Sequence, residues 1–547
     1  MMQTPAYLPR GHFLAQGKLE AAGAPRLGAD SMASRGSADS ESMRAALDRS
    51  IASLGHVPGS FALAAADERT GVLCLARDAS GSHGLYFHHD EHGRVHYASR
   101  LNLLLAELPE PPRISADGLA EYLRFLDITA PQTIYDGVFA VPPGQAVLFE
   151  RGRCSFIELD MHPDTPLPGS YAEALDCVEQ RIRSSIHHAA QGVRSPAAFL
   201  SGGVDSALLC ALGRPVVSDA ITLGFDDSRY DESGIASSVA TSLGMRHTVL
   251  RPSEDDFFSL FMLTHGQSEQ PFCDPAAMAT RFAFDYCTQR YDLLIDGTGA
   301  EILPGSMPAR WRRWAYDYTA WMPRRLRQGL ARLPGLRRHR RLFDYDDQED
   351  LFIRWQGFHS AEIKRLTGHA TDLAHTRFYR TFRMLRSTDH LRRWSILQGT
   401  LLPDDRIRQA SSASGLPCAH PFLDASVGPL MAALPRDWCH APGRPKRLLR
   451  DILGRHVPSA LWEQPKHGFE FDFCSFMRRN RSRLTEPYLI GRHATLDRLL
   501  SPVATRQVFD DWCAGNDALS FRVWALLILS AWLSHGPLVT DQLNRSR

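Results

Sequence analysis

Residues 201–206 read Ser-Gly-Gly-Val-Asp-Ser, and these residue types at this spacing suit the binding of a phosphate group together with a metal ion. Gly202 and Gly203 allow a tight turn and a close approach of the backbone to a ligand. Successive N–H groups at the start of a helix attract anions, and the two serine hydroxyls add donors. The carboxylate of Asp205 would repel a bare phosphate but suits a magnesium ion carried with it. The segment lacks the Gly-Lys-Ser/Thr ending of a Walker-type loop, so it predicts a different phosphate site.

The elements around this segment alternate between strands and helices. Apolar residues 197–200 predict a strand that ends directly before the glycines, and residues 206–212 predict the helix that follows. The pattern continues with predicted strands at 220–225, 247–250 and 292–295 and a predicted helix at 235–243. Such alternation is typical of a parallel sheet with helices on both faces.

The pattern of apolar and polar residues differs in the rest of the chain. Residues 60–160 contain short apolar runs separated by Asp, Gly and Ser, which predict hairpins, with one helix capped by Ser115. Residues 161–170 contain three prolines and are interpreted as a linker. From about residue 350 the pattern is mostly helical, and residues 523–533 predict a buried helix.

Composition excludes several classes of protein. The chain has 547 residues, of which 44% are hydrophobic and 22% charged, so it is neither disordered nor collagen-like. The net charge of +1 gives no electrostatic reason to expect a nucleic acid or an anionic membrane as partner. No secretory signal and no apolar stretch of the roughly 20 residues needed to cross a bilayer is evident. The ten cysteines form no C-x-x-C pair, which fits free thiols in a cytoplasmic protein better than a metal or disulfide scaffold.

The segment 197–212 resembles the pyrophosphate loop of ATP pyrophosphatases, which cleave ATP between its α and β phosphates. Six further stretches stand in the order seen in the synthetase domain of asparagine synthetase: 222–233, 296–305, 401–405, 420–435, 444–453 and 464–471. Three upstream stretches, 71–87, 96–105 and 134–149, resemble the glutaminase domain of that enzyme. The resemblance covers nearly the whole chain from about residue 58.

The resemblance implies a chain that is α+β in its first part and α/β in its second. Residues 1–160 are expected to form a degenerate, glutaminase-like β-sandwich of the N-terminal-nucleophile type that lacks the catalytic cysteine. Residues 170–547 are expected to form an ATP pyrophosphatase (synthetase) domain, built on a parallel sheet and ending in a helical part. ATP and Mg²⁺ are the cofactors that the resemblance implies.

The resemblance also implies roles for individual residues. Lys466 matches the lysine placed over the reacting carbonyl, where a cation stabilises developing negative charge. Glu301 falls where the family has a magnesium-binding aspartate, and would share the ion with Asp205. Contacts with ATP or pyrophosphate are expected from Phe199, Leu200, Ser201, Gly202, Gly203, Asp205, Ser206, Leu223, Asp296, Gly297 and Lys446.

Two departures from the family pattern bear on function. The glutaminase nucleophile of asparagine synthetase is a cysteine directly after the initiator methionine, whereas position 2 here is Met2 and the first cysteine is Cys74. Glutamine is therefore not expected to supply the nitrogen. Thr298 stands where asparagine synthetase has a glutamate and β-lactam synthetases have a tyrosine, and it cannot be a strong base. Asp405, or Asp404, lies near the position of the acid that pairs with that tyrosine; alternatively, this pair caps a helix.

Lasso peptide cyclases match these departures. They resemble asparagine synthetase, lack its cysteine, and join the N-terminal amine of a core peptide to an internal Asp or Glu side chain. The sequence therefore predicts an AMP-forming macrolactam ligase, with a precursor peptide as substrate and a cysteine-protease-type leader peptidase as partner. The alternatives are a β-lactam synthetase-like enzyme or an ammonia-dependent asparagine synthetase acting on a small amino acid, and, in another class, a non-catalytic assembly partner.

Overall fold

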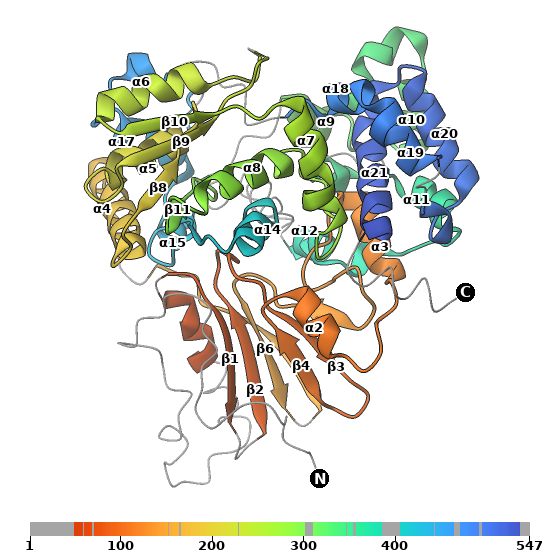
Figure 1. Cartoon of the computed structure of the whole chain (residues 1–547), viewed down its shortest axis with the longest axis horizontal. Helices are drawn as coiled ribbons and strands as arrows, with labels where there is room; N and C mark the ends of the chain where they lie inside the picture. Colours follow the sequence, from red (N-terminus) through yellow and green to blue (C-terminus); the bar gives the residue numbers. More distant parts are fainter. Residues whose placement is uncertain are drawn as a thin grey trace.

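The computed structural model describes most of the chain from residue 49 to residue 535. The residues left out are 1–48, 58, 68–70, 151, 164–165, 228, 301–309, 346, 354–356, 385–404, 442, 464–470, 492–494 and 536–547. Three regions are visible: antiparallel sheets below, a parallel sheet at upper left and a helical part at upper right (Figure 1).

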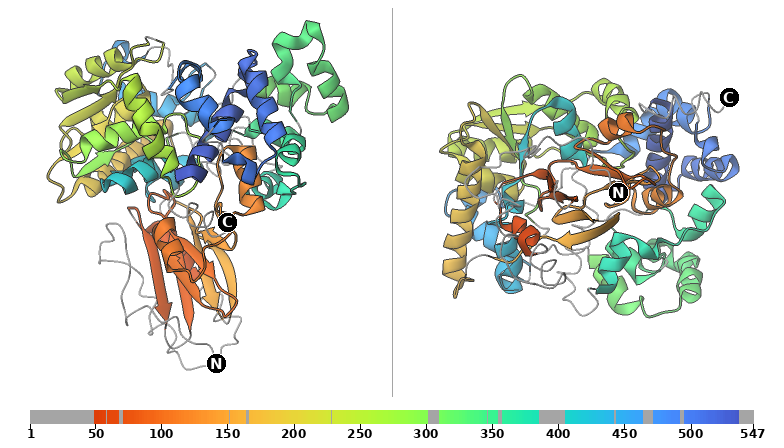
Figure 2. Two further views of the ribbon diagram at one scale, coloured as in Figure 1. Left: turned by 45° about the vertical axis from the view of Figure 1, so that its right-hand side comes forward. Right: turned by 90° about the horizontal axis from the view of Figure 1, so that it is seen from below.

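Two antiparallel sheets form the first region. The order of the larger is β1-β2-β6-β7 and that of the smaller is β4-β3-β5. Leu75 and Val147 of the larger sheet and Phe87 of the smaller belong to one buried cluster, and the rings of Phe87 and Phe149 lie 5.3 Å apart. The two sheets therefore pack against each other through a shared core (Figure 2). Their strands are β1 (Ala62–Asp67), β2 (Val72–Arg77), β3 (Tyr86–His89), β4 (Val95–Ala98), β5 (Val138–Ala140), β6 (Gln145–Glu150) and β7 (Arg153–Glu158).

The second region is a parallel sheet of order β10-β9-β8-β11-β12. Its strands are β8 (Pro196–Phe199), β9 (Asp219–Leu223), β10 (Arg246–Leu250), β11 (Leu293–Ile295) and β12 (Cys418–Ala419). The predicted parallel sheet is confirmed, and the four predicted strands end within two residues of the observed ones. Strand β12 was not predicted, because two residues leave no periodic signal.

Helices cover both faces of this sheet, as the alternation predicts. Side chains of β8 alternate between two cores: Ala198 packs with one set of helices and Ala197 with the other. The first set comprises α4 (Tyr171–Ala190), α5 (Val204–Gly213), α6 (Ser233–Leu243), α15 (Gly428–Ala433) and α17 (Arg447–Leu453). The second comprises α8 (Ala277–Cys287) and α14 (Asp405–Ser414).

The third region is helical and is organised around α21 (Ser520–His535). The other helices of this part are α7 (Glu254–Phe261), the π-helix η2 (Met262–Gly266), α9 (Arg310–Tyr318), α10 (Arg324–Ala331), α11 (Ser360–Thr367), α12 (Arg377–Met384), α18 (Phe473–Arg479), α19 (Glu486–Leu489) and α20 (Pro502–Cys513). The short helix α16 (Arg436–Cys439) packs instead in the core of the second region. The segment Asp517–His535 is long and apolar enough to cross a membrane by length and composition, yet 67% of it is buried inside the structure. The predicted buried helix at 523–533 is confirmed.

Helix α3 (Ala116–Phe125) links the first region to the third. Its N-terminus is capped by Ser115, whose side chain accepts a hydrogen bond from the N–H of Gly118, as the sequence predicts. The Tyr122 hydroxyl donates to the carbonyl of Ala525 at 2.8 Å, and α3 shares its core with α21. The first region therefore contributes a helix to the core of the third, and the predicted boundary between residues 160 and 170 stays a prediction.

His265 predicts an acid-dependent loss of stability. Its ring is fully buried among Phe261, Phe272 and Trp524, and burial lowers its pKa to about 3. In the unfolded chain the imidazole of His265 takes up a proton near pH 6.5, whereas in the folded protein it does so only near pH 3. The contribution of His265 to the free energy of unfolding is therefore fully present above pH 6.5. Below pH 6.5 the free energy of unfolding falls, with a slope that approaches about 1.4 kcal/mol per pH unit. Replacing His265 with Met should remove that slope between pH 6.5 and 4 in urea unfolding; an unchanged slope would contradict the assignment.

Candidate functional site

The segment Ser201–Ser206 leaves the end of β8 and enters α5, as predicted from the sequence. The hydroxyls of Ser201 and Ser206 lie 3.0 Å apart, and the N–H of Ser201 donates to Ser206 Oγ at 2.9 Å. The N–H of Gly203 donates to Ser201 Oγ at 3.1 Å. The two serines therefore brace the turn from inside and hold its amides in position.

The amide of Gly202 already binds an anionic oxygen. Its N–H donates to Oε2 of Glu232 at 3.1 Å, and Glu232, at the start of α6, is buried. A Cβ atom at position 202 would lie 3.0 Å from Cβ of Glu232, so this close approach favours glycine. The loop thus has the donor geometry for an anion, which is the chemistry that the sequence predicts.

Asp205 and Lys446 form an ion pair across 241 residues of sequence. Lys446 Nζ lies 2.5 Å from Asp205 Oδ2, and both side chains are largely buried. Lys446 caps α17 in the left-handed region, at φ 58°, a conformation that costs a non-glycine residue roughly 1–2 kcal/mol. Such strain is found mainly where the surrounding structure needs a side chain in one place.

The other carboxylate oxygen of Asp205, Oδ1, bears on metal binding. Oδ1 is buried and has no hydrogen-bond partner among the described residues. A buried, unpaired carboxylate oxygen is costly unless a cation completes it. Asp205 therefore fits a magnesium ion, which typically takes one or two protein carboxylates and fills its other positions with phosphates and water. Glu301, the second predicted ligand, lies outside the described residues.

Asp296 and Thr298 follow β11, the strand next to β8. The N–H of Thr298 donates to Asp296 Oδ1 at 2.8 Å, and the Thr298 hydroxyl donates to the same oxygen. Burial alone would raise the pKa of Asp296, but the imidazole of His420, 3.7 Å away, the Thr298 hydroxyl and the charge of Arg406 together hold it well below its usual range. Two hydrogen bonds from Thr298 therefore hold one oxygen of the Asp296 carboxylate, and the catalytic role of Thr298 stays a prediction.

These segments surround a cavity of about 210 Å³. Phe199, Ile221 and Leu223 form an apolar wall, whereas Asp205, Glu232 and Asp296 contribute carboxylates. The predicted residues that line the cavity are Phe199, Leu200, Ser201, Asp205, Ser206, Leu223, Asp296, Gly297 and Thr298. Three other predicted residues do not line the cavity but hydrogen-bond to residues that do: Gly202, Gly203 and Lys446.

Sequence reasoning missed several lining residues. They include Arg406 and Ile407 of α14, Thr280 of α8 and Tyr230. Arg406 directly follows the Leu-Leu-Pro-Asp-Asp motif, so a basic residue beside a recognised motif was the available signal. Asp405 is the first residue of α14. Its side chain, Asp404 and Lys466 lie outside what the structure describes, so the acid and helix-cap alternatives both stay predictions.

Replacement of Gly299 with Ala is predicted to lower both stability and activity. Gly299 has φ +103°, and a Cβ atom there would lie 2.4 Å from Cγ of Leu423. Replacement with Ala should cost about 1–3 kcal/mol for overpacking, in addition to backbone strain, and should reduce AMP formation by displacing Thr298. Gly368, at φ +79° with no neighbouring atom within 4 Å, is the matched control for strain alone. Equal melting temperatures for the two alanine variants would contradict this account.

Family profiles and sequence relatives identify the family of this chain. The profile described as asparagine synthase matches residues 178–534, and that described as glutamine amidotransferase domain matches residues 25–158. The glutamine-hydrolyzing asparagine synthetase 1 of Bacillus subtilis is 23% identical over 499 residues, covering 87% of this chain and 77% of the relative. A Mycobacterium tuberculosis protein named "putative asparagine synthetase (glutamine-hydrolyzing)" is 24% identical over 507 residues, covering 88% and 77%. Among solved structures, the NMN synthetase of Francisella tularensis matches with a TM-score of 0.19 and 17% identity, covering 28% of this chain and 59% of that one.

Proposed function

Because this chain belongs to the asparagine synthase family and is thus an ATP-dependent carbon–nitrogen ligase, we propose that its substrate is a precursor peptide in which it closes a macrolactam ring. The carboxylate comes from an Asp or Glu side chain of the core peptide, and the nitrogen comes from its N-terminal amine. The observation that carries the adenylating half of this proposal is the braced loop Ser201–Ser206, with Asp205 and Lys446 paired beside the cavity.

The reaction has two steps. An oxygen of the substrate carboxylate attacks the α-phosphorus of ATP, the bond from that phosphorus to the oxygen bridging to the β-phosphate breaks, and pyrophosphate leaves. The amine nitrogen then attacks the acyl carbon, the bond to AMP breaks, and a base accepts the amine proton. Because both reacting groups belong to one bound peptide, proximity can supply up to roughly 7–11 kcal/mol.

The residues of the site divide these tasks. In this proposal the amides of residues 202 and 203 exchange their present acceptors, Glu232 and Ser201, for oxygens of the departing pyrophosphate. Lys446 moves from Asp205 to the phosphates. Asp205 and Glu301 would hold Mg²⁺, which lowers the charge repulsion around the phosphates. Lys466 stabilises the acyl oxygen in this proposal, and Asp405 is the candidate acceptor of the amine proton.

The cysteines of the first 160 residues bear on the nitrogen source. The sequence has two there, Cys74 and Cys154. Cys74 is buried within β2, and burial raises its pKa to about 12, so it holds no thiolate near neutral pH. Cys154 is exposed on the edge strand β7. The buried Cys74 therefore offers no activated nucleophile for a glutamine amide, which supports an amine already present in the substrate.

All ten cysteines lie in the described part of the chain, and all are free thiols. Free thiols are the state expected in a reducing compartment, which supports a cytoplasmic location for the proposed reaction. The leader peptide must be removed before the N-terminal amine of the core peptide can react. A cysteine-protease-type peptidase is therefore the partner that the proposal requires.

The test is incubation of the full chain with ATP, Mg²⁺, the precursor peptide and its leader peptidase. We expect AMP, pyrophosphate and a peptide lighter by one water molecule, with a cross-link between its first residue and an Asp or Glu. A linear peptide recovered together with AMP would contradict the ring closure. Asparagine formed from aspartate and ammonium, or exchange of pyrophosphate driven by a small amino acid alone, would select the alternatives.

A further inference from the structure

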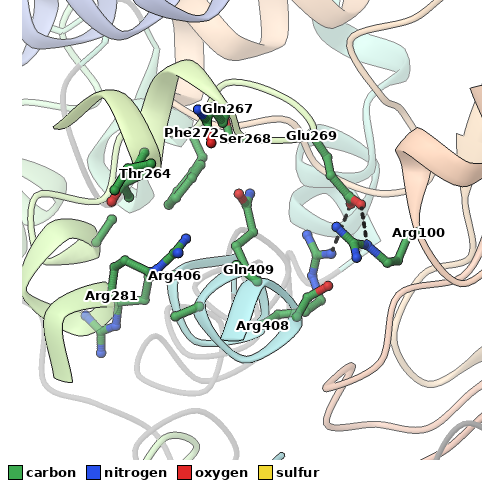
Figure 3. Close-up of a pocket in the computed structure, with 15 residues that line it drawn as sticks. Arg100, Thr264, Gln267, Ser268, Glu269, Phe272, Arg281, Arg406, Arg408 and Gln409 are labelled. Carbon is green, nitrogen blue, oxygen red and sulfur yellow. Dashed lines mark hydrogen bonds and ion pairs between the residues drawn. The ribbon is translucent and has the colours of Figure 1, made fainter. Parts of the chain in front are cut away.

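A second cavity, of about 250 Å³, lies beside the first. It is bounded by η2, the loop that follows it, α8, α14 and Arg100 of the first region (Figure 3). Helices α8 and α14 each line both cavities: α8 presents Thr280 to the first and Arg281 to the second. Arg406 of α14 lines both, so its guanidinium marks the boundary between them.

Arginines predominate among the charged residues that line this second cavity. Its charged lining residues in the described part of the chain are Arg100, Arg281, Arg406, Arg408 and Glu269. Glu269 lies between two of the arginines, with Oε1 3.3 Å from Arg100 Nε and Oε2 4.0 Å from Arg408 Nη1 (Figure 3). This carboxylate shows which functional group the cavity accommodates, because it already bridges two guanidinium groups.

The other side of the cavity holds hydrogen-bonding groups that lack partners. Thr264 is 8% exposed, and its hydroxyl has no partner among the described residues. The amide nitrogen of Gln409 is buried without a partner, and its side chain extends from α14 into the cavity (Figure 3). Arg281 contacts Asp285 through Nε, and the other nitrogens of its guanidinium group are donors for a further acceptor. Buried donors without acceptors are costly, so this donor set suits an oxygen-rich anionic ligand.

We propose that this arginine cavity binds the carboxylate-bearing side chain of the acyl substrate and presents it, past Arg406, to the nucleotide. The inference rests on the proposed function and deepens it, since it states where the carboxylate waits before it reacts. A carboxylate is favoured over a phosphate because Glu269 would repel a dianion more strongly than a monoanion. The phosphates of the nucleotide, moreover, have their own donors in the Ser201–Ser206 loop.

The probe is N-acetyl-L-aspartate α-methylamide, which carries one side-chain carboxylate, and its asparagine analogue is the neutral control. Titration calorimetry on the full chain without ATP should detect binding of the aspartate probe and none of the asparagine analogue. Arg281→Met and Gln409→Met should each weaken that binding by about tenfold or more, the typical loss for a hydrogen bond to a charged group. In pyrophosphate exchange, the same variants should raise KM for the probe and leave KM for ATP unchanged.

The chain offers matched controls on α20. Arg506 forms an i,i+4 pair with Asp510, as Arg281 does with Asp285, and Gln507 hydrogen-bonds to Asp511. Arg506→Met and Gln507→Met should leave probe binding unchanged. Should a test variant misfold, Thr264→Val, which removes one hydroxyl at constant volume, takes its place.

The outcomes separate the two proposals. Unchanged affinity and KM in both test variants would overturn the cavity assignment, whatever the enzyme catalyses. Binding of inorganic phosphate in preference to the aspartate probe, lost in the same variants, would overturn it in favour of a phosphate site. Variant-sensitive binding of the probe in an enzyme that shows no exchange with any carboxylate would uphold the cavity and overturn the proposed function.

Discussion

Replacing Asp205 with Asn is expected to reduce AMP formation by about 10²–10³-fold, because it removes the charge that faces both Lys446 and the metal. The substitution keeps the volume of the side chain and its ability to accept from Lys446, which lies 2.5 Å from Oδ2. It removes the anionic character of Oδ1, which is buried without a partner among the described residues. The loss of activity should therefore depend on Mg²⁺, and the unpaired charge left on Lys446 should also lower the melting temperature.

Calorimetry with ATP distinguishes this account from a general loss of structure. Without Mg²⁺, the wild type and Asp205→Asn should bind ATP with similar affinity; with Mg²⁺, the wild type alone should gain affinity. Asp511→Asn, an exposed change on α20, is the control and should behave as the wild type. If Asp205→Asn keeps more than about a tenth of the activity, the metal role of this carboxylate is wrong.

Replacing Lys446 with Met is expected to lower kcat/KM by about 10²–10³-fold and to weaken pyrophosphate binding. The ammonium group of Lys446 pairs with the carboxylate of Asp205. The methionine side chain of the variant has no charge, so it can bind neither Asp205 nor a phosphate as the ammonium group does. The variant should also melt at a lower temperature. Removing one partner of a buried pair costs up to about 3–5 kcal/mol, and partial exposure of 11% and 18% reduces that figure here.

A double-mutant cycle checks the assignment. Asp205→Asn combined with Lys446→Met should be more stable than Lys446→Met alone, because the double variant leaves no unpaired charge. Lys364→Met, on the exposed face of α11, is the control for loss of a lysine. Additive effects of the two substitutions on the melting temperature would show that the pair does not couple, and would contradict the proposed transfer of Lys446 between partners.

Local sequence determined the elements of the phosphate loop. The strand that ends before Ser201, the helix that follows and the buried helix at 523–533 are all where periodicity places them. This success has a physical cause: each is encoded by residues within one or two turns of each other. Lysine usage is a further signal, since the sequence has only four lysines, Lys18, Lys364, Lys446 and Lys466, of which two are candidate site residues. A lysine carries its charge on a flexible stem, which arginine does not reproduce.

Only the tertiary structure decided which distant groups meet. Lys446 reaches Asp205, His420 reaches Asp296, and Arg406 stands between two cavities because β11 pairs with β8 and β12 pairs with β11. The pairing of β11 with β8 joins strands separated by some ninety residues, and no local pattern reports it. The arginine cavity has the same origin: its charges come from α8, α14 and Arg100, which become neighbours only when the three regions share their cores. Periodicity reports which face of an element is buried, whereas strand order and packing decide what that face meets.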